Sequence, residues 1–262
     1  MSDALVGHTG FVGGNLAAQH RFEATFNSKT IESIRGRSFG RLVVSALPAE
    51  MWVANRDPDA DRAALDRLWA NLSQCRAEEV AVISTVAVYA TPIAVDEDTL
   101  IEPSLATAYG RHRLELEQRL HWHFPRVVAV RLPGLYGPGL KKNAVYDLLH
   151  DNQVNKLHAG SVYQFYNTTR LWRDVEAALR SGARVVNLAT EPVTVREVAR
   201  AAFGRDFGND PGSRPACFDV RTKHAPLFGG RDGYLETREQ VLAGLARFVS
   251  AERSPASPRL AA

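Results

Sequence analysis

The stretch Ala4-Leu5-Val6-Gly7-His8-Thr9-Gly10-Phe11-Val12-Gly13 decides the fold of this chain. A short apolar run comes first, glycines follow at every third position, and a helical pattern begins directly after them. In such a turn the first glycine lets the chain leave a strand sharply, the second lets the backbone approach a pyrophosphate, and the third lets the helix pack on the sheet. The stretch therefore predicts a dinucleotide-binding turn, with a glycine-rich loop that binds nothing as the alternative. The residues of this turn predicted to contact a cofactor are Gly7, Thr9, Gly10, Phe11, Val12 and Gly13.

Composition and charge indicate an ordinary globular protein. The chain has 262 residues, of which 45% are hydrophobic and 23% charged, enough for one large domain with a smaller lobe. The formal net charge is +3 and the two signs are interspersed, so no tract favours nucleic acid or a membrane surface, whereas a small anionic ligand suits the slight positive bias. Neither a signal peptide nor a membrane span is expected, and Cys75 and Cys217 are typical of buried thiols in a reducing compartment. We predict a cytoplasmic protein.

The first half of the chain alternates short apolar runs with helical patterns, which predicts βαβ units and a mostly parallel sheet. Because the connection from Phe26 to Leu42 is short, we expect one edge strand of a full Rossmann sheet to be missing or abbreviated. Strands are predicted at 4–6, 23–26, 42–46, 80–84 and 127–132, and helices at 30–35, 59–74 and 106–123.

The composition changes after Pro138, which predicts a second part of the chain. Helices are predicted there at 141–151, 169–181, 193–203 and 237–250, a strand at 185–188 and a loop at 207–215. The fold class that follows is α/β, with a Rossmann-type, doubly wound, mostly parallel sheet and a small C-terminal α/β substrate lobe. The predicted domains are a dinucleotide-binding domain over 1–137, completed by strand 185–188, a substrate lobe over 138–253, and a disordered tail over 254–262.

Three later segments place reactive side chains at one edge of the predicted sheet. The strand at 80–84 runs on into Thr85, which puts a hydroxyl at the carboxyl end of a strand, where open parallel sheets bind ligands. Tyr109 and Arg113 lie four residues apart near the start of a helix, so both share one helical face. The strand at 127–132 leads into the rigid turn that begins at Pro133.

With these segments in view, the chain resembles the extended short-chain dehydrogenase/reductase superfamily, the NAD(P)-dependent sugar-nucleotide epimerases, dehydratases and reductases. The resemblance covers about residues 4–205 and includes Val88-Tyr89, the turn from Arg131 to Pro138, and the segment from Val186 to Thr194. It implies that Tyr109 is a general acid/base and that Thr85 hydrogen-bonds the same substrate oxygen. It also implies that Arg113 stands where the family has a lysine, which lowers the pKa of the tyrosine and holds the nicotinamide ribose, and that Pro133 contacts the cofactor.

The exchange of lysine for arginine has physical consequences. A free tyrosine titrates near ~10, so a nearby cation is needed if it is to act as a base at neutral pH. A unit charge about 4 Å away contributes roughly 4 kcal/mol at an effective dielectric constant near 20, which corresponds to at most about 3 pKa units. Arg113 can supply that charge, but it cannot release a proton, and its planar fork meets the ribose differently. The alternative is that Arg113 forms a surface ion pair with Glu117 one turn on.

The choice of cofactor depends on residues after the second strand. NAD-preferring turns carry an acidic residue there for the ribose 2′-hydroxyl, whereas this chain has Asn27, Ser28 and Lys29, with Arg35 and Arg37 beyond them. These cations favour NADP over NAD. The alternative is that they are simply solvated and do not contact the cofactor.

The substrate is less defined than the cofactor. No acidic residue follows Thr85, because Val86 and Ala87 stand there, so the elimination chemistry of dehydratases is not expected. Lys141, Lys142 and Asn143 could clamp a diphosphate or form an exposed first turn of a helix.

Two further motifs carry no function in this context. Gly36-Arg37-Ser38-Phe39-Gly40 matches the serine-hydrolase elbow, but a helix precedes it and a strand follows, which is the reverse of the required order. His121 and His123 are two apart on a helix and point in different directions, so we predict no metal site.

The sequence predicts an NAD(P)-dependent oxidoreductase or epimerase acting on a hydroxyl or carbonyl carbon of a small anionic substrate, with a nucleotide sugar as one candidate. The alternative is a catalytically inactive dinucleotide-binding sensor or scaffold. A homodimer could form through the helices at 59–74 and 106–123, or their apolar faces could cover the sheet.

Overall fold

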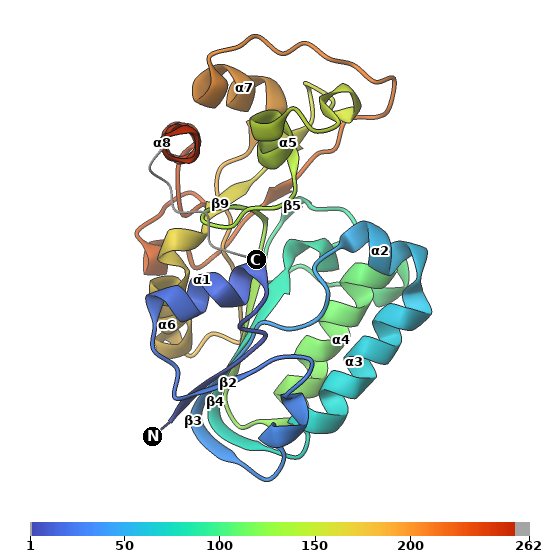
Figure 1. Ribbon diagram of the computed structural model, residues 1–262, viewed down its shortest axis with the longest axis vertical. Helices are drawn as coiled ribbons and strands as arrows, with labels where there is room; N and C mark the ends of the chain where they lie inside the picture. The colour runs from blue at the N-terminus through green and yellow to red at the C-terminus, as the bar shows by residue number, and fades with distance from the viewer. Residues whose placement is uncertain (1, 255–262) are drawn as a thin grey trace. The chain divides into compact units, whose positions relative to one another are not determined.

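The computed structural model describes residues 2–254, and the chain forms two compact units (Figure 1). The first unit consists of residues 2–91, 97–132 and 169–187, and the second of 92–96, 133–168 and 188 onward. The second unit thus includes residues 92–96 as well as the segment from 133, and the helix within 169–187 belongs to the first unit together with the strand that was predicted to complete its sheet. The predicted disordered tail, apart from Ser254, lies outside the described residues.

The core of the first unit is a six-stranded sheet in the order β10-β6-β4-β3-β1-β2, and every neighbouring pair is parallel. The predicted Rossmann-type sheet is therefore confirmed. Its strands are β1 (Asp3–Val6), β2 (Ala24–Phe26), β3 (Ser38–Val44), β4 (Arg76–Thr85), β6 (Val127–Leu132) and β10 (Val185–Asn187).

The sheet ends at β2, a strand of three residues. Between β2 and β3 the chain forms only the 3₁₀ helix η1 (Ile31–Ile34) and turns. A further parallel strand would need a crossover of a dozen or more residues on each side, which this connection cannot supply. The prediction of an abbreviated edge is confirmed.

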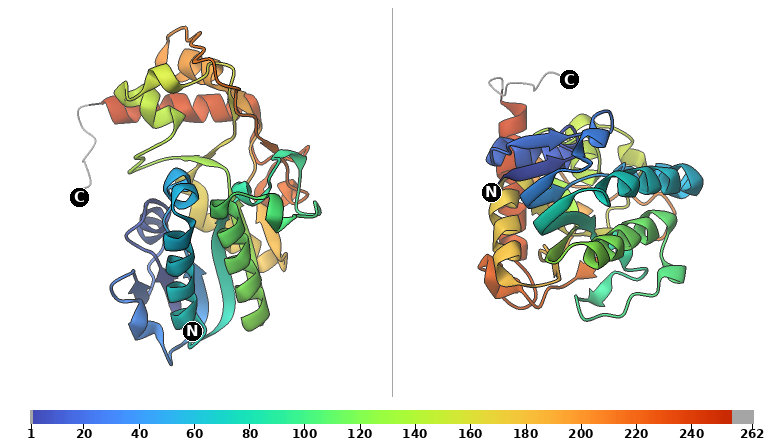
Figure 2. Two further views of the ribbon diagram at one scale, coloured as in Figure 1. Left: turned by 90° about the vertical axis from the view of Figure 1, so that its right-hand side faces the viewer. Right: turned by 90° about the horizontal axis from the view of Figure 1, so that it is seen from below.

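Helices cover both faces of this sheet (Figures 1 and 2). On one side lie α1 (Phe11–Gln19) and α6 (Leu171–Ser181), and on the other α2 (Met51–Arg56), α3 (Pro58–Leu72) and α4 (Ala108–His123). The apolar stripes of α3 and α4 pack against the strands in one buried cluster, which includes Leu65, Leu72, Leu116 and Leu120. Of the two uses considered for these apolar faces, the structure shows that they cover the sheet.

The second unit is a small α/β assembly without a large sheet. Its core is formed by Tyr136, Phe165 and the apolar faces of three helices. Two of these helices begin with capping boxes, at Thr194 and Thr237, in which side chain and backbone satisfy each other's polar groups. The paired strands are β5 (Ile93–Val95) with β12 (Asp219–Val220), β7 (Gly134–Tyr136) with β9 (Phe165–Asn167), and β8 (Val162–Tyr163) with β11 (Val193–Thr194). The helices are α5 (Ala144–His150), α7 (Val195–Phe203) and α8 (Arg238–Arg253).

The two cysteines differ in their surroundings. Cys75 is buried in the core of the first unit, and burial raises the pKa of its thiol to about 11. Cys217 is exposed, so the prediction of two buried thiols is wrong for this residue. Within the described residues, no helix combines the length and apolar character needed to cross a membrane.

Candidate functional site

The glycine turn between β1 and α1 is closely packed against its own backbone. Gly7 has a φ of +90°, and a Cβ there would lie 1.9 Å from the carbonyl oxygen of Ser45. A Cβ at Gly13 would lie 2.0 Å from the carbonyl oxygen of Gly7. Any side chain at either position would collide with main chain, so the turn can pass beside Ser45 only because residue 7 is glycine, and helix α1 can approach the turn only because residue 13 is glycine.

Gly10 is different, because a Cβ there would make only an ordinary contact at 3.5 Å with the carbonyl oxygen of Gly7. It is the N-cap of α1, and no side chain caps the first turn of that helix. Uncapped amides at a helix N-terminus favour an anionic oxygen. Thr9 and Gly10 are exposed and Phe11 and Val12 half-buried, so this part of the turn is accessible, and its contact with a cofactor stays a prediction.

The residues predicted to select NADP differ in their contacts and exposure. Asn27 accepts hydrogen bonds from the backbone N–H groups of Lys29 and Thr30, at 2.9 and 3.2 Å, and so closes the turn after β2. Arg35 donates to Asn71 on α3 at 2.7 Å. Ser28 and Lys29 are exposed at the carboxyl end of β2.

Arg37 directly precedes β3 and therefore lies at the amino end of that strand, whereas the glycine turn follows the carboxyl end of parallel β1. Its guanidinium lies over the rings of Phe26 and Phe39, 5.2 Å from each centroid. Of the three cations, only Lys29 is both exposed and placed at the carboxyl edge.

Thr85 and Tyr109 meet at the carboxyl end of β4. The Thr85 hydroxyl oxygen accepts the Ala87 N–H at 3.1 Å, and its side chain hydrogen-bonds the Tyr109 phenol. Since Thr85 already accepts from backbone, its own proton is directed at the phenol oxygen. A hydroxyl and a phenol thus share one hydrogen bond at the ligand-binding edge of a parallel sheet.

Gly110 allows Thr85 and Tyr109 to meet, and the sequence analysis did not single out this glycine. A Cβ at Gly110 would lie 2.1 Å from the carbonyl oxygen of Ala87, so α4 could not approach the turn after β4 with any other residue there. The available signal was a glycine inside a helical pattern, where glycine costs about 1 kcal/mol relative to alanine and so needs a packing reason.

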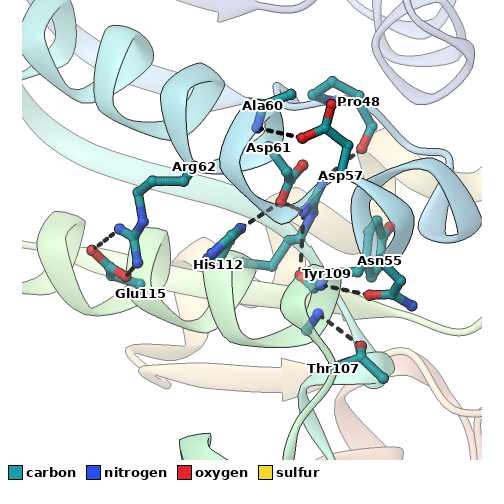
Figure 3. Close-up of polar contacts among 12 residues, drawn as sticks. Pro48, Asn55, Asp57, Ala60, Asp61, Arg62, Thr107, Tyr109, His112 and Glu115 are labelled. Atoms are coloured by element: carbon teal, nitrogen blue, oxygen red, sulfur yellow. Dashed lines mark hydrogen bonds and ion pairs between the residues drawn. The ribbon is translucent and has the colours of Figure 1, made fainter.

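Two further contacts fix the start of α4 (Figure 3). The Thr107 hydroxyl caps the N–H of Gly110 at 3.3 Å, and Asn55 on α2 accepts the N–H of Tyr109 at 3.0 Å. The backbone of Tyr109 is therefore held from two directions.

Arg113 is buried and already bound by protein oxygens. It donates from Nη1 to Asp61 at 2.5 Å and from Nη2 to the carbonyl oxygen of Pro48 at 2.5 Å. Its guanidinium carbon lies 3.9 Å from the centroid of the Tyr109 ring. The alternative surface pair with Glu117 is wrong, because Glu117 faces the sheet and binds Arg131.

Asp61 is the second residue that the sequence analysis missed. It is 4% exposed, and its Oδ2 accepts both from Arg113 and from His112 Nδ1, the latter at 2.7 Å. Figure 3 shows Asp61 of α3 pointing at His112 of α4. Its other oxygen, Oδ1, is buried without a hydrogen-bond partner among the described residues. The sequence did indicate that Asp61 is buried, because it lies on the same helical stripe as the buried Leu65 and Leu68.

The pKa of Tyr109 is raised above its ordinary value of 10.0. Burial of the phenol is the main cause, and the charges of Asp61 and Glu50 act in the same direction. The Arg113 cation and the Thr85 hydrogen bond lower the pKa, as the sequence analysis expected of the cation, but they do not outweigh burial. The phenol is therefore protonated at neutral pH.

Behind the strand ends lies a buried polar network, which also escaped the sequence analysis. Ser84 donates to Glu117, and Glu117 accepts from Arg131 at 3.1 and 2.7 Å. Arg131 also donates to the Tyr89 hydroxyl at 2.9 Å, and Tyr89 accepts from Asn187 at 3.1 Å. The network links α4 to β4, β6 and β10 and holds the strand ends in register.

Two predicted contacts belong to the second unit. Pro133 directly follows β6, at the start of the segment 133–168 of the second unit. The contact of Pro133 with the cofactor stays a prediction. The helix predicted at 141–151 begins only at Ala144, with Asn143 as its N-cap at a φ of 111°. Asn143 accepts from Val145 and Tyr146, so it is committed to the cap, and the two preceding lysines lie outside the helix rather than in its first turn.

Comparison with known proteins relates this chain to others by its structure alone. No protein-family model and no curated protein sequence matches it. The UDP-glucose 4-epimerase of Thermotoga maritima, solved with UDP-glucose, superposes with a TM-score of 0.72 at 15% identity, covering 97% of this chain and 99% of the other.

Two further structures are similar to about the same extent. The dTDP-4-dehydrorhamnose reductase of Clostridium acetobutylicum has a TM-score of 0.72 at 16% identity, with 97% and 100% of the two chains covered. RMD of Pseudomonas aeruginosa, solved with NADPH, has a TM-score of 0.69 at 18% identity, with 96% and 100% covered. The chain therefore has the fold of the sugar-nucleotide epimerases and reductases over nearly its whole length, as the resemblance predicted.

Proposed function

We propose that this protein binds NADP, in preference to NAD, and catalyses hydride transfer at a carbon that bears a hydroxyl or carbonyl group. The observation that carries the proposal is the hydrogen bond between Thr85 and Tyr109 at the carboxyl end of β4. Strand β4 belongs to the same sheet as β1, which the glycine turn follows. Gly7 and Gly13 of that turn leave no room for a side chain, which suits the close approach of a pyrophosphate. This arrangement supports a reaction better than it supports binding alone, because a cofactor-binding turn does not require a half-buried phenol paired with a hydroxyl.

The roles of the side chains follow from their chemistry. The nicotinamide supplies or accepts the hydride. Tyr109 exchanges the hydroxyl proton of the substrate, and Thr85 orients the same oxygen through its hydroxyl. Arg113, whose guanidinium carbon lies 3.9 Å from the Tyr109 ring centroid, keeps positive charge near the phenol. Because it already donates three hydrogen bonds to protein oxygens, we assign it a smaller part in holding the ribose.

We propose a nucleotide sugar as the substrate class and the second unit as the part that recognises it. Structures with the same fold were solved with UDP-glucose and with UDP-N-acetylmuramic acid, which supports this choice. The reaction is then an epimerisation or an oxidoreduction of the sugar.

Binding and turnover can be tested separately. Purified protein is titrated with NADPH and NADH by fluorescence, and nicotinamide absorbance is then followed with UDP-glucose and with a 4-keto nucleotide sugar. We expect saturable binding, turnover, and a loss of about 10²–10⁴-fold in kcat for Tyr109→Phe with unchanged NADPH binding. Full turnover by Tyr109→Phe would refute the assignment of that residue.

Cofactor choice has its own test. In Lys29→Glu we expect weaker NADPH binding and unchanged NADH binding, because only NADPH carries the 2′-phosphate that the ammonium would meet. Arg21→Glu, an exposed change outside the turn, is the matched control.

The second candidate is a dinucleotide-binding sensor or scaffold. The observation that favours it is the raised pKa of Tyr109, together with the capture of Arg113 by Asp61, since neither suits a tyrosine that acts as a base. Tight NADPH binding without turnover on any substrate, and without gain from Arg113→Lys, would select this alternative.

A further inference from the structure

One residue near Tyr109, the buried Asp61, has no role in the proposed reaction. Asp61 approaches from α3, is 4% exposed, and places a single oxygen between two donors of α4, His112 Nδ1 and Arg113 Nη1. A buried carboxylate is costly unless its charge is used, and here one of its two oxygens has no hydrogen-bond partner among the described residues.

Asp61 acts on Tyr109 through Arg113. The guanidinium is held at one end by the Asp61 carboxylate and at the other by the carbonyl oxygen of Pro48, and between them it lies 3.9 Å from the Tyr109 ring centroid. Removal of either anchor would free the guanidinium to turn toward the phenol oxygen. The carboxylate also offsets part of the effect of the cation on the phenol, because its charge raises the pKa of Tyr109 whereas that of Arg113 lowers it.

We propose that Asp61 is a positioning residue that anchors Arg113 and offsets part of its charge, so that Tyr109 is kept as a proton donor and the site works as a carbonyl reductase. This inference rests on the proposed function. In the reductive direction the carbonyl carbon gains a hydride from the reduced nicotinamide and the carbonyl oxygen gains the proton of Tyr109. Tyr109 then regains a proton from water, and the product is an alcohol.

The charged groups that face Tyr109 agree with this assignment. Arg113 on α4 is the one cation among them, whereas Asp61 on α3 and Glu50 before α2 are both anions. Together with burial, these anions favour the protonated phenol, and Arg113 and the Thr85 hydroxyl oppose them.

The effect of the Asp61 charge on the pKa of Tyr109 is tested without cofactor or substrate. The protein is labelled with ¹³C at the tyrosine Cζ, the Tyr109 resonance is assigned from its loss in Tyr109→Phe, and its pH titration is followed in the wild type, Asp61→Asn and Asp66→Asn. Asp66 lies on the same helix but is 51% exposed, which makes it the matched control. We expect Asp61→Asn to lower the titration midpoint by about one unit, and Asp66→Asn to leave it in place.

A midpoint in Asp61→Asn that moves no further than in Asp66→Asn, or that moves upward, overturns the proposal. Asp61→Ser replaces Asp61→Asn if circular dichroism shows that the asparagine variant does not fold, and the same downward shift is expected from it.

The catalytic part is tested by the direction of turnover at pH 7. We expect reduction of a 4-keto nucleotide sugar with NADPH to exceed oxidation of UDP-glucose with NADP⁺ by tenfold or more in kcat, and Asp61→Asn to narrow that ratio. In the variant, the reductive rate also falls at a lower pH than in the wild type, because its phenol ionises earlier. A ratio that Asp61→Asn leaves unchanged overturns the proposal. Absence of all turnover together with the expected midpoint shift would instead refute the proposed function while leaving the electrostatic role of Asp61 in place.

Discussion

Helix α4 carries two buried ion pairs one turn apart, and they are built in opposite ways. Glu117 belongs to a network in which both carboxylate oxygens and three nitrogens of Arg131 are engaged. Arg113 pairs with Asp61, whose Oδ1 is buried without a partner among the described residues. Both pairs are nearly inaccessible to water, so the contrast is one of hydrogen-bond completeness rather than of burial.

The difference separates a structural pair from a functional one. A complete network stabilises one arrangement of strands and helix, because every alternative leaves a buried group unpaired. An incomplete pair gives up some stability, which proteins tolerate where charge is needed for chemistry. The incomplete pair is the one that contacts Tyr109.

The largest effect is expected from the complete network. Glu117→Ala leaves the Arg131 guanidinium buried without its counter-charge, and we expect a loss of about 3–5 kcal/mol in the free energy of unfolding. Urea denaturation followed by circular dichroism measures this loss. A loss below about 1 kcal/mol would show that water or a neighbouring group replaces the carboxylate.

A smaller effect is expected where α4 meets the turn after β4. Gly110→Ala places a Cβ against the backbone of Ala87, so the helix start must shift, and we expect a cost of about 1–3 kcal/mol in unfolding free energy together with loss of the contact between Thr85 and Tyr109. Gly14→Ala in α1 is the control, because its Cβ would make only an ordinary contact at 3.7 Å. Equal behaviour of the two variants would contradict the packing argument.

The incomplete pair should matter less for stability. For Asp61→Asn we expect a loss of about 1–2 kcal/mol in unfolding free energy, because the buried guanidinium loses its counter-charge while asparagine keeps an oxygen for it. The measurement is the same urea titration, run beside Glu117→Gln. A larger loss in Asp61→Asn than in Glu117→Gln would reverse the comparison of the two pairs.

The smallest effect is expected on the outer face of α3 and α4. The hydrogen bond from Arg62, followed by that from Arg119, lowers the pKa of Glu115 below its ordinary value of 4.5. A depressed pKa means that the pairs stabilise the fold above pH 4.5 and that this contribution is lost as the pH falls through the folded pKa. Because the partners are partly exposed, we expect about 0.5 kcal/mol, measured as the difference in unfolding free energy between wild type and Glu115→Gln at pH 7 and pH 3. An equal difference at both pH values would contradict this sign.

Much of the fold could be predicted from the sequence because its signals are local. The order strand, glycine turn, helix is written in consecutive residues, and the short connection after Phe26 limits the sheet edge through chain length alone. Cys217 shows the limit of composition, since a cysteine's usual burial does not say which cysteines are buried. The helix predicted from Lys141 began three residues late because Asn143, a strong N-cap, was not used as the start signal.

The sequence by itself determined the parallel sheet and the edge at which Thr85 and Tyr109 would lie, because strand direction and helical periodicity follow from residues close together in the chain. Only the tertiary structure decided the partner of Arg113. Glu117 was the carboxylate one turn away on the same face of the helix, but it turns inward to the sheet and binds Arg131. Asp61, 52 residues before Arg113, pairs with it instead from the neighbouring helix. The pairing of buried charges depends on which elements pack together, and that is a property of the whole fold.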